Sequence, residues 1–347
     1  MHAGQKFSLK EVVRWTSREI YIFLFLAAVP TVLYAVFDLK WVGITWLPIA
    51  LLGTAVAFLI GFKNNASYDR LWEARKIWGA IVNSSRTWGI MSKDFVSNTH
   101  AEKRASESEL HQAHRRLIYR HVGWLTALRF QLRQSKAWEN MNKTANAEYR
   151  KIYKVPEWEN KLEEELDVFI SPEEKAYVLG KKNRATQLLS LQSKDLRELR
   201  DQGLIDDFRH VELENMLKDF FTQQGKCERI KNFPYPRQFA TINLYFVWIF
   251  ILFVPFGLLT PFAELSSDLE GIYKGITVWL TIPFSALVCW VFHTMEKIGT
   301  ATENPFEGGA NDIPMAALSR TIEIDLREML EESDLPKPVQ AFNHILM

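Results

Sequence analysis

"AVAFLIGFKNNASYDRLW", residues 55–72, runs from an apolar segment into a polar one without an interruption. The uncharged part ends at Phe62, and Lys63 and two asparagines follow directly. No proline stands in the stretch, and no glycine follows Phe62 until Gly79. Proline and glycine are the residues that most often end a helix. The stretch therefore predicts one helix that continues from lipid depth into water.

Four stretches of the 347-residue chain contain no Asp, Glu, Lys or Arg. Each is close to the ~17–25 residues with which an α-helix crosses the hydrocarbon core. Tryptophan and tyrosine lie near several of their ends, as in interfacial belts. A buried core helix is the alternative for any single run, but four together predict an all-α protein with four transmembrane helices. The runs cover residues 20–37, 41–62, 238–263 and 275–295.

Charge is distributed unevenly around these runs, although the net charge of +1 gives no support for nucleic-acid binding. By the positive-inside rule, both termini and the long middle segment are predicted to be cytoplasmic. The first run is long and lacks a small-residue exit, so we expect a retained span rather than a cleaved signal peptide. The basic side contains Lys6, Lys10, Arg14, Arg18, Lys63, Arg70, Arg75, Lys76, Lys226, Arg229, Lys231 and Arg237, and the acidic connection contains Glu264, Asp268 and Glu270 with Lys274.

The spans divide the chain into membrane and cytoplasmic parts. Apolar residues recur at helical spacing through the middle of the chain, and no alternating strand is evident, so the middle is predicted to be a helical domain. The predicted parts are residues 1–62 (a cytoplasmic segment and the first hairpin, with spans at about 20–37 and 41–62), 63–233 (the helical cytoplasmic domain), 234–295 (the second hairpin) and 296–347 (a cytoplasmic tail).

One narrow face of the second run continues into the polar segment when residues are placed at about 100° intervals. The face is apolar as far as Phe62 and polar beyond it. A helix that lines a water-filled path on an oligomer axis has such continuity, and packing in a helix bundle gives similar spacings, so both interpretations stay open. The face consists of Leu47, Leu51, Thr54, Phe58, Phe62, Asn65, Asp69 and Trp72.

The sequence contains no glycine-rich phosphate loop, no HExxH and no GxSxG motif, so no catalytic residue and no enzyme activity are predicted. His111, His114 and His121 lie close together on one predicted helix. Histidines so spaced either meet a metal or, more commonly, are solvated, and we expect solvated side chains. Cys227 and Cys289 have no metal-type spacing and predict no disulfide.

Two longer segments resemble the bestrophin family, and particularly its bacterial members. They are NNASYDRLWEARKIWGAIVNSSR at residues 64–86 and ENPFEGGANDIPMAALSRTIEIDL at residues 303–326. The resemblance covers nearly the whole chain, with both motifs in the expected order on the expected topology. It implies a homopentameric ion channel with one axial pore, in which the second helix lines a hydrophobic neck and cytoplasmic helices enclose a vestibule with an aperture.

The resemblance assigns the neck to Thr54, Phe58 and Phe62 through the Tyr-Asp-Arg-x-Trp motif at residues 68–72. Five copies of each phenylalanine would make two stacked apolar rings without ligands that replace an ion's hydration shell. Such a constriction gates by dewetting. Thr54 replaces the aliphatic residue usual in the family, and its hydroxyl is expected to ease wetting of the outer mouth.

Asn65 and Asp69 follow the neck and are expected to form the polar entry to the vestibule. Lys63 lies on the opposite side of the helix and is expected not to govern conduction. The aperture is implied on the helix predicted for LIDDFRHVEL, residues 204–213. It is apolar if Phe208 faces the axis and favours anions if Arg209 does; Phe208 packed in the domain core is an equally weighted alternative.

Eukaryotic bestrophins bind Ca²⁺ in a clasp with an acidic run after an NPF motif. Here Gly308, Gly309 and an alanine stand where acids would concentrate, whereas Ca²⁺ takes six to eight oxygen ligands. Asn304 and Asp312 remain as candidate ligands of a weak calcium site beside Glu307. We expect a structural turn rather than calcium activation, and no required cofactor.

The predicted function is a passive channel for monovalent ions. Chloride-type anions are slightly favoured because aromatic ring edges carry partial positive charge, while Asp69 argues for cations. The alternatives are a monovalent cation channel of the same fold and a non-conducting membrane scaffold; a secondary transporter is disfavoured because no inverted repeat is visible. The predicted partners are four further copies of the chain, the permeating ions and the lipid bilayer, and no nucleic acid.

Overall fold

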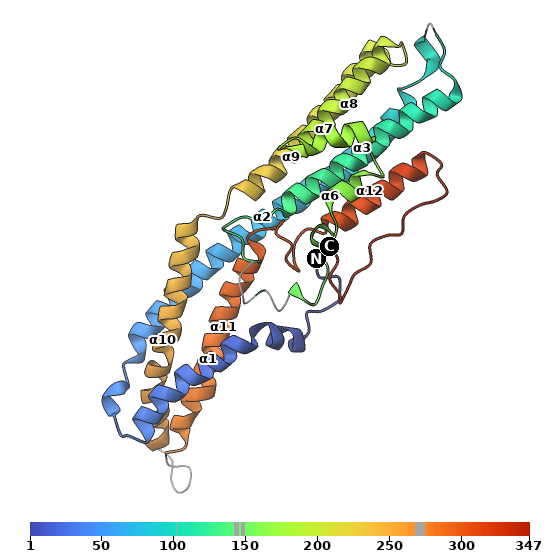
Figure 1. The fold of residues 1–347 in the computed structure, drawn as a ribbon. Helices are drawn as coiled ribbons and strands as arrows, with labels where there is room; N and C mark the ends of the chain where they lie inside the picture. Colours follow the sequence, from blue (N-terminus) through green and yellow to red (C-terminus); the bar gives the residue numbers. More distant parts are fainter. Residues whose placement is uncertain (102, 142–145, 147–149, 268–274) are drawn as a thin grey trace. The chain divides into compact units, whose positions relative to one another are not determined.

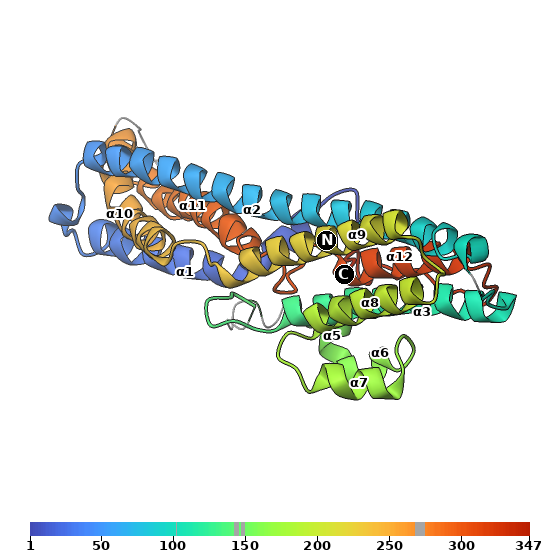
Figure 2. The same cartoon turned by 90° about the horizontal axis from the view of Figure 1, so that it is seen from above.

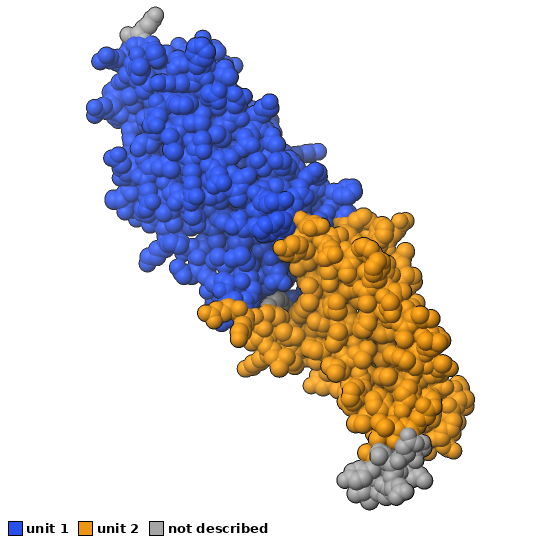
Figure 3. All heavy atoms as spheres, turned by 180° about the vertical axis from the view of Figure 1, so that it is seen from behind, with its two compact units in different colours: residues 1–4, 70–234, 304–347 blue, residues 5–69, 235–303 orange. Residues whose placement is uncertain are grey.

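The computed structural model describes residues 1–347 except 102, 142–145, 147–149 and 268–274. Within the described residues the regular structure is helical, with isolated β-bridges only (Figure 1), which confirms the all-α prediction. Asp268, Glu270 and Lys274 of the acidic connection lie outside the described residues. The chain forms two compact units, coloured separately in Figure 3: unit 1 is residues 1–4, 70–234 and 304–347, and unit 2 is residues 5–69 and 235–303.

Unit 2 contains the four apolar helices that the uncharged runs predict. Each is long and apolar enough to cross a membrane. Helices α1, α10 and α11 pack against one another (Figure 2) around a core that includes Phe23, Val56, Phe250 and Cys289. The unit comprises α1 (Leu9–Ala35), η1 (Lys40–Val42), the first part of α2 (Trp46–Asp94), α10 (Arg237–Ser267), η4 (Thr277–Leu280) and α11 (Thr281–Thr302).

Helix α2 is one continuous helix of 49 residues. At about 1.5 Å per residue it is roughly 70 Å long, more than twice the ~30 Å of a hydrocarbon core. Its residues belong to both units, with the boundary between Asp69 and Arg70. Helix α2 therefore continues past Phe62, as the absence of proline and glycine there predicts.

Unit 1 is built on long helices with local start signals. Ser106 and Glu109 form a capping box at the start of α3, and Asp206 caps α9. Ser171 caps α7, and Pro172 stands at its first position. The helices are the remainder of α2, α3 (Glu107–Arg133), α5 (Pro156–Glu159), α6 (Leu162–Leu166), α7 (Pro172–Leu179), α8 (Arg184–Asp201), α9 (Asp207–Asn232) and α12 (Met315–Met329), with η2 (Asn98–His100).

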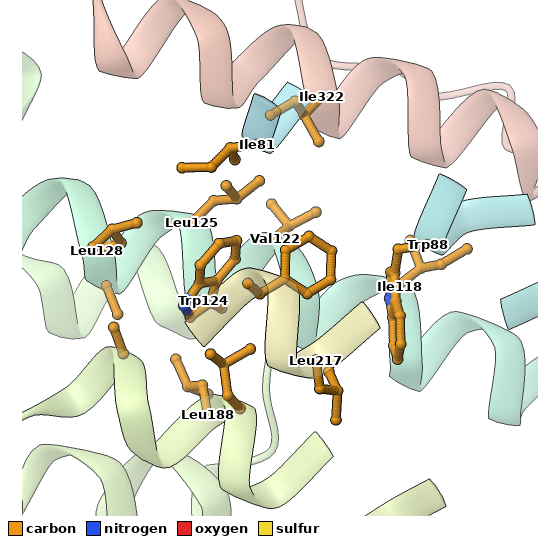
Figure 4. Packing of buried hydrophobic residues seen from close by; sticks show 14 of the residues in the cluster. Ile81, Trp88, Ile118, Val122, Trp124, Leu125, Leu128, Leu188, Leu217 and Ile322 are labelled. Carbon is orange, nitrogen blue, oxygen red and sulfur yellow. The ribbon is translucent and has the colours of Figure 1, made fainter. Parts of the chain in front are cut away.

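The core of unit 1 is large and aromatic. Trp88 and Trp124, both fully buried, pack against the ring of Phe220 with centroids 6.0 and 5.1 Å away. Figure 4 shows side chains from α2, α3, α8, α9 and α12 meeting there. Buried ion pairs add to this packing; one joins Arg120 of α3 to Asp195 of α8 at 2.8 Å.

Candidate functional site

The face of α2 that the helical spacing groups together is exposed along its whole length. Phe58 and Phe62 expose 68% and 57% of their area. The other members are exposed as well: Leu47, Leu51, Thr54, Asn65, Asp69 and Trp72. An apolar stripe of this length indicates a surface that lipid, another copy or a narrow pore completes.

Phe58 and Phe62 lie one turn apart and contact each other. Their ring centroids are 4.5 Å apart at an interplanar angle of 80°, an edge-to-face arrangement. The Thr54 hydroxyl, one turn earlier, donates to the Ala50 carbonyl at 3.0 Å. Because this bond uses the hydroxyl proton, Thr54 offers water only its oxygen lone pairs. The three residues present a face that is apolar at its centre and weakly polar at its outer end.

The opposite face of α2 carries a buried charge beside these rings. The Lys63 ammonium lies 2.5 Å from a carboxylate oxygen of Glu296 and donates to the Thr300 hydroxyl at 2.6 Å. The Thr300 hydroxyl in turn donates to Glu296 at 2.9 Å. Lys63 and Glu296 are both almost fully buried. This pair fastens α2 to α11 at the residue that follows Phe62.

The next residue adds a second connection between the same helices. The Asn64 side-chain amide donates to the Met295 carbonyl at 3.1 Å. A Cβ on Gly299 would lie 2.2 Å from the Asn64 amide oxygen, so a larger residue at position 299 would require the Asn64 side chain to move. Together with the Lys63–Glu296 pair, this contact holds one side of α2, while the aromatic side is mostly exposed.

The polar residues below the rings are exposed. Asp69 has no cation within ion-pair distance among the described residues. Arg70, a candidate to neutralise it, instead donates to the Ile230 carbonyl at 3.1 Å. Asp69 therefore presents its carboxylate on the same face of α2 as Phe62.

The start of α9 separates the two aperture candidates. Phe208 is 88% exposed, so the alternative that packs it in the domain core is wrong. Arg209 pairs with Asp206 at 3.2 Å and lies over the Phe95 ring, 5.7 Å from its centroid. The backbone amide of Arg209 lowers the pKa of the Asp206 carboxyl, and the guanidinium adds to this effect. Arg209 is thus held against its own unit, and Phe208 projects from it.

The loop after the fourth membrane helix is a tight turn. Asp312 accepts the backbone amides of Gly308 and Gly309 at 2.7 and 2.9 Å, and lies 3.6 Å from the Arg133 guanidinium. Gly308 has φ of +95°, and a Cβ there would lie 2.4 Å from Trp158. Burial raises the pKa of Asp312 to about 6.

The calcium candidates take part in hydrogen bonds of this turn. Asp312 Oδ2 accepts the two glycine amides, and the Asn304 amide donates to Glu307 at 3.3 Å. Glu307 also accepts the Asn140 backbone amide at 2.8 Å. No group of three or more metal-ligating side chains occurs within the residues that the structure describes.

The three histidines of α3 differ in environment. His111 is exposed, but the expectation of solvation is wrong for His121, which is fully buried against Trp124 and Phe220. Its Nε2 lies 2.9 Å from the Ser85 hydroxyl, and burial lowers its pKa to about 3. His114 Nε2 lies 2.8 Å from the Val96 carbonyl. The three histidines thus lie in different environments, exposed, partly buried and fully buried.

Sequence reasoning missed the partner of Lys63. A signal was available, because Val56, Ile60, Lys63 and Ser67 recur at spacings of three and four and are all buried. A charge on a buried stripe needs an opposite charge. Glu296 is the first acid after the fourth uncharged run and supplies that charge.

Comparison with known proteins identifies the family of the chain. A sequence profile described as bacterial/fungal bestrophin protein matches residues 7–328. A voltage-dependent anion channel-forming protein, YneE of Escherichia coli K12, is 26% identical over 95% of this chain and 91% of its own length. A protein of the same description from Ralstonia nicotianae is 26% identical, over 88% and 84% of the two chains.

A solved structure shares the fold. It is a bacterial bestrophin homologue from Klebsiella pneumoniae, which aligns with a TM-score of 0.72 at 22% identity and covers 91% of this chain and 98% of its own. The profile match extends over far more than half of the chain and includes both faces of α2. The chain belongs to the bacterial and fungal bestrophin family.

Proposed function

We propose that five copies of this chain form a passive ion channel in a bacterial inner membrane, with α2 of each copy around a central axis. The observation that carries the proposal is the distribution of residues on α2, where apolar side chains are exposed and a charged one is buried. Phe58 and Phe62 are exposed, whereas Lys63 is buried and paired. Lipid contact alone does not account for the exposed face, because the face continues through Asn65 and Asp69 and remains exposed where it is polar.

The neck in this proposal is formed by Thr54, Phe58 and Phe62. Rings of phenylalanine offer no oxygen to replace the water around an ion, so conduction depends on whether the neck is wide enough to stay wet. A small change in the tilt of α2 would change the ring diameter without breaking a covalent or ionic contact. The transport step is diffusion and includes no catalysis.

In the same proposal, unit 1 is cytoplasmic, both termini are cytoplasmic and Phe208 lines the aperture. The exposure of Phe208 and the pairing of Arg209 with Asp206 support this assignment. We also propose that the loop at residues 304–312 is structural, so that currents are equal in millimolar Ca²⁺ and in a chelator. A Ca²⁺-dependent increase in current would contradict this part.

The primary test is conduction by the purified full-length protein in planar bilayers. Wild type is expected to give unitary currents, and Phe58→Ala and Phe62→Ala are expected to change them strongly. Phe25→Ala is the matched control, because Phe25 is equally exposed, at 68%, but lies on α1. No current from wild type or from any variant would overturn the channel and favour a membrane scaffold.

The sign of the permeating ion is a separate question. We propose a preference for anions, in line with the relatives that are described as anion channel-forming. The exposed carboxylate of Asp69 favours the second candidate, a channel for monovalent cations. Reversal potentials in a KCl gradient separate the two, and Asp69→Asn is expected to shift the potential towards anion permeation in either case.

The number of subunits is tested independently of current. Native mass spectrometry of the detergent-solubilised protein is expected to show five protomer masses. A monomer or dimer would contradict the axial neck, because one or two α2 helices cannot enclose the proposed rings. Phe58→Ala should give the same number of protomers as wild type.

A further inference from the structure

The first turns of α1 carry a row of exposed basic side chains. The helix begins at Leu9 and is fixed by a capping box between Ser8 and Glu11. Lys10, Arg14 and Arg18 follow at intervals of four residues and are all exposed. Side chains four apart are neighbours on one face of a helix, about 5–6 Å from each other. The structure therefore presents three positive charges in one row.

No carboxylate of α1 neutralises this row. The Glu11 side chain accepts bonds from the Ser8 backbone and hydroxyl at 2.7 and 2.6 Å, within the cap. The Glu19 side chain lies 2.9 Å from the Lys297 ammonium of α11. Both acids of this segment are therefore engaged elsewhere, and the row faces outward with its full charge.

The same face of α1 becomes apolar one turn later. Tyr21, Phe25 and Val29 continue the direction of the basic row and are exposed. The opposite face, with Phe23 and Ala27, is buried inside unit 2. An exposed apolar stripe on a membrane-length helix matches hydrocarbon. The change from basic to apolar between Arg18 and Tyr21 thus marks the hydrocarbon boundary.

Aromatic side chains at the same level agree with this boundary. Trp15 stands between Arg14 and Arg18 on α1. The Lys297 ammonium lies 4.8 Å from the centroid of the Trp15 ring. Trp290 of α11 donates its indole N–H to the Thr16 hydroxyl at 2.9 Å. Tryptophan is enriched where headgroups meet hydrocarbon. The basic row therefore lies at the depth of lipid phosphates.

We propose that Lys10, Arg14 and Arg18 form a binding surface for anionic phospholipid headgroups, with the acyl chains along Tyr21 and Phe25. The occupant follows from charge complementarity. A row of three exposed basic side chains, whose neighbouring acids Glu11 and Glu19 bond to Ser8 and Lys297, is directly continuous with an apolar stripe and matches a molecule with an anionic head and an apolar tail. A zwitterionic lipid matches the stripe and not the row. Each basic side chain near a charged surface contributes about fivefold to affinity.

The test is the association of spin-labelled phosphatidylglycerol, relative to spin-labelled phosphatidylcholine, with the full-length protein in lipid bilayers, measured by electron paramagnetic resonance. Wild type is expected to prefer phosphatidylglycerol. The triple variant Lys10→Gln, Arg14→Gln, Arg18→Gln is expected to lose most of that preference, and Arg14→Lys with Arg18→Lys is expected to retain it.

The matched control removes three exposed positive charges from unit 1. It is Lys181→Gln, Lys182→Gln, Arg197→Gln, and it is expected to leave the lipid preference unchanged. An unchanged preference in the α1 variant would overturn the proposal, as would an equal loss in both triple variants. Equal association of both lipids with wild type would overturn it as well.

Discussion

The two faces of α2 between Thr54 and Lys63 reverse the usual distribution of residues in a protein. On one face, two phenylalanine rings contact each other and are mostly exposed. On the other, an ammonium group is buried against Glu296 and Thr300. In a soluble domain the rings would be inside and the charge outside.

The buried face holds α2 in place within the subunit, whereas the exposed face is available for contacts outside it. A buried ion pair loses its hydration and recovers that energy only through good geometry, so the pair fixes the position of α2 relative to α11. The rings leave more than half of their area exposed. Their exposure is therefore retained for contacts that the single chain does not contain, which is the basis of the proposed neck.

Breaking the buried face has the largest expected effect. Lys63→Met leaves the Glu296 carboxylate buried without its cation, which is expected to cost about 3–5 kcal/mol. Thermal unfolding of the solubilised protein measures the loss. The double variant Lys63→Met, Glu296→Gln is expected to recover most of it. Equal melting temperatures for wild type and Lys63→Met would show that the pair does not hold the helix.

A buried polar group without an ionic partner responds differently to pH. His121 has a pKa of about 3 in the folded protein against its ordinary 6.5, because it is buried. Below pH 6.5 the unfolded chain takes up a proton that the folded chain does not, so stability falls as the pH decreases from 6.5 towards 3. The expected loss is about 2 kcal/mol by pH 5.

Equilibrium unfolding at pH 7.5 and at pH 5 measures this slope. His121→Gln is expected to flatten it, and Phe58→Ala, which changes the exposed face only, is expected to leave it as in wild type. An unchanged slope in His121→Gln would assign the pH dependence to other groups.

Changing the exposed face is expected to alter conduction with little change in stability. Phe62→Ala widens the proposed neck and removes an apolar ring, so current at a fixed voltage is expected to rise several-fold. Its melting temperature is expected to remain close to that of wild type, in contrast to Lys63→Met. A large loss of stability in Phe62→Ala with unchanged current would assign the ring to packing.

The smallest expected effect is that of Phe208 on α9, where the same comparison can be made because Phe208 is exposed and Phe220 is fully buried. Phe208→Ala is expected to change stability by less than about 0.5 kcal/mol, whereas Phe220→Ala is expected to cost about 3–5 kcal/mol. Chemical unfolding of both variants gives the ratio. A similar cost for the two would mean that Phe208 is covered in the assembled protein.

Much of the fold follows from patterns that are local in the sequence. Four uncharged runs predict four membrane helices because the thickness of hydrocarbon sets the number of residues that cross it. Helical spacing groups the exposed residues of α2, and capping signals locate the start of α7. The spacing of about 100° per residue also places Lys63 away from Phe58 and Phe62, and the structure agrees.

Other features depend on residues that are distant in the chain. Helical spacing does not predict that Lys63 is buried, because its burial depends on pairing with Glu296, which is 233 residues away in the sequence. The sequence likewise leaves Phe208 either packed or exposed, and helical spacing allows His121 to be solvated. Burial is a property of the elements that surround a side chain, and those contacts exist only in the folded protein.

The sequence by itself determined the helices, their apolar lengths, the continuity of α2 and the residues that share its exposed face, since spacing and composition are enough for these. Only the tertiary structure decided that Lys63, beside the proposed neck, is buried in an ion pair. It also decided that Arg209 pairs with Asp206 while Phe208 is exposed, and that Asp312 closes the loop at residues 304–312. The physical reason is that desolvation and pairing depend on which distant residues meet in space.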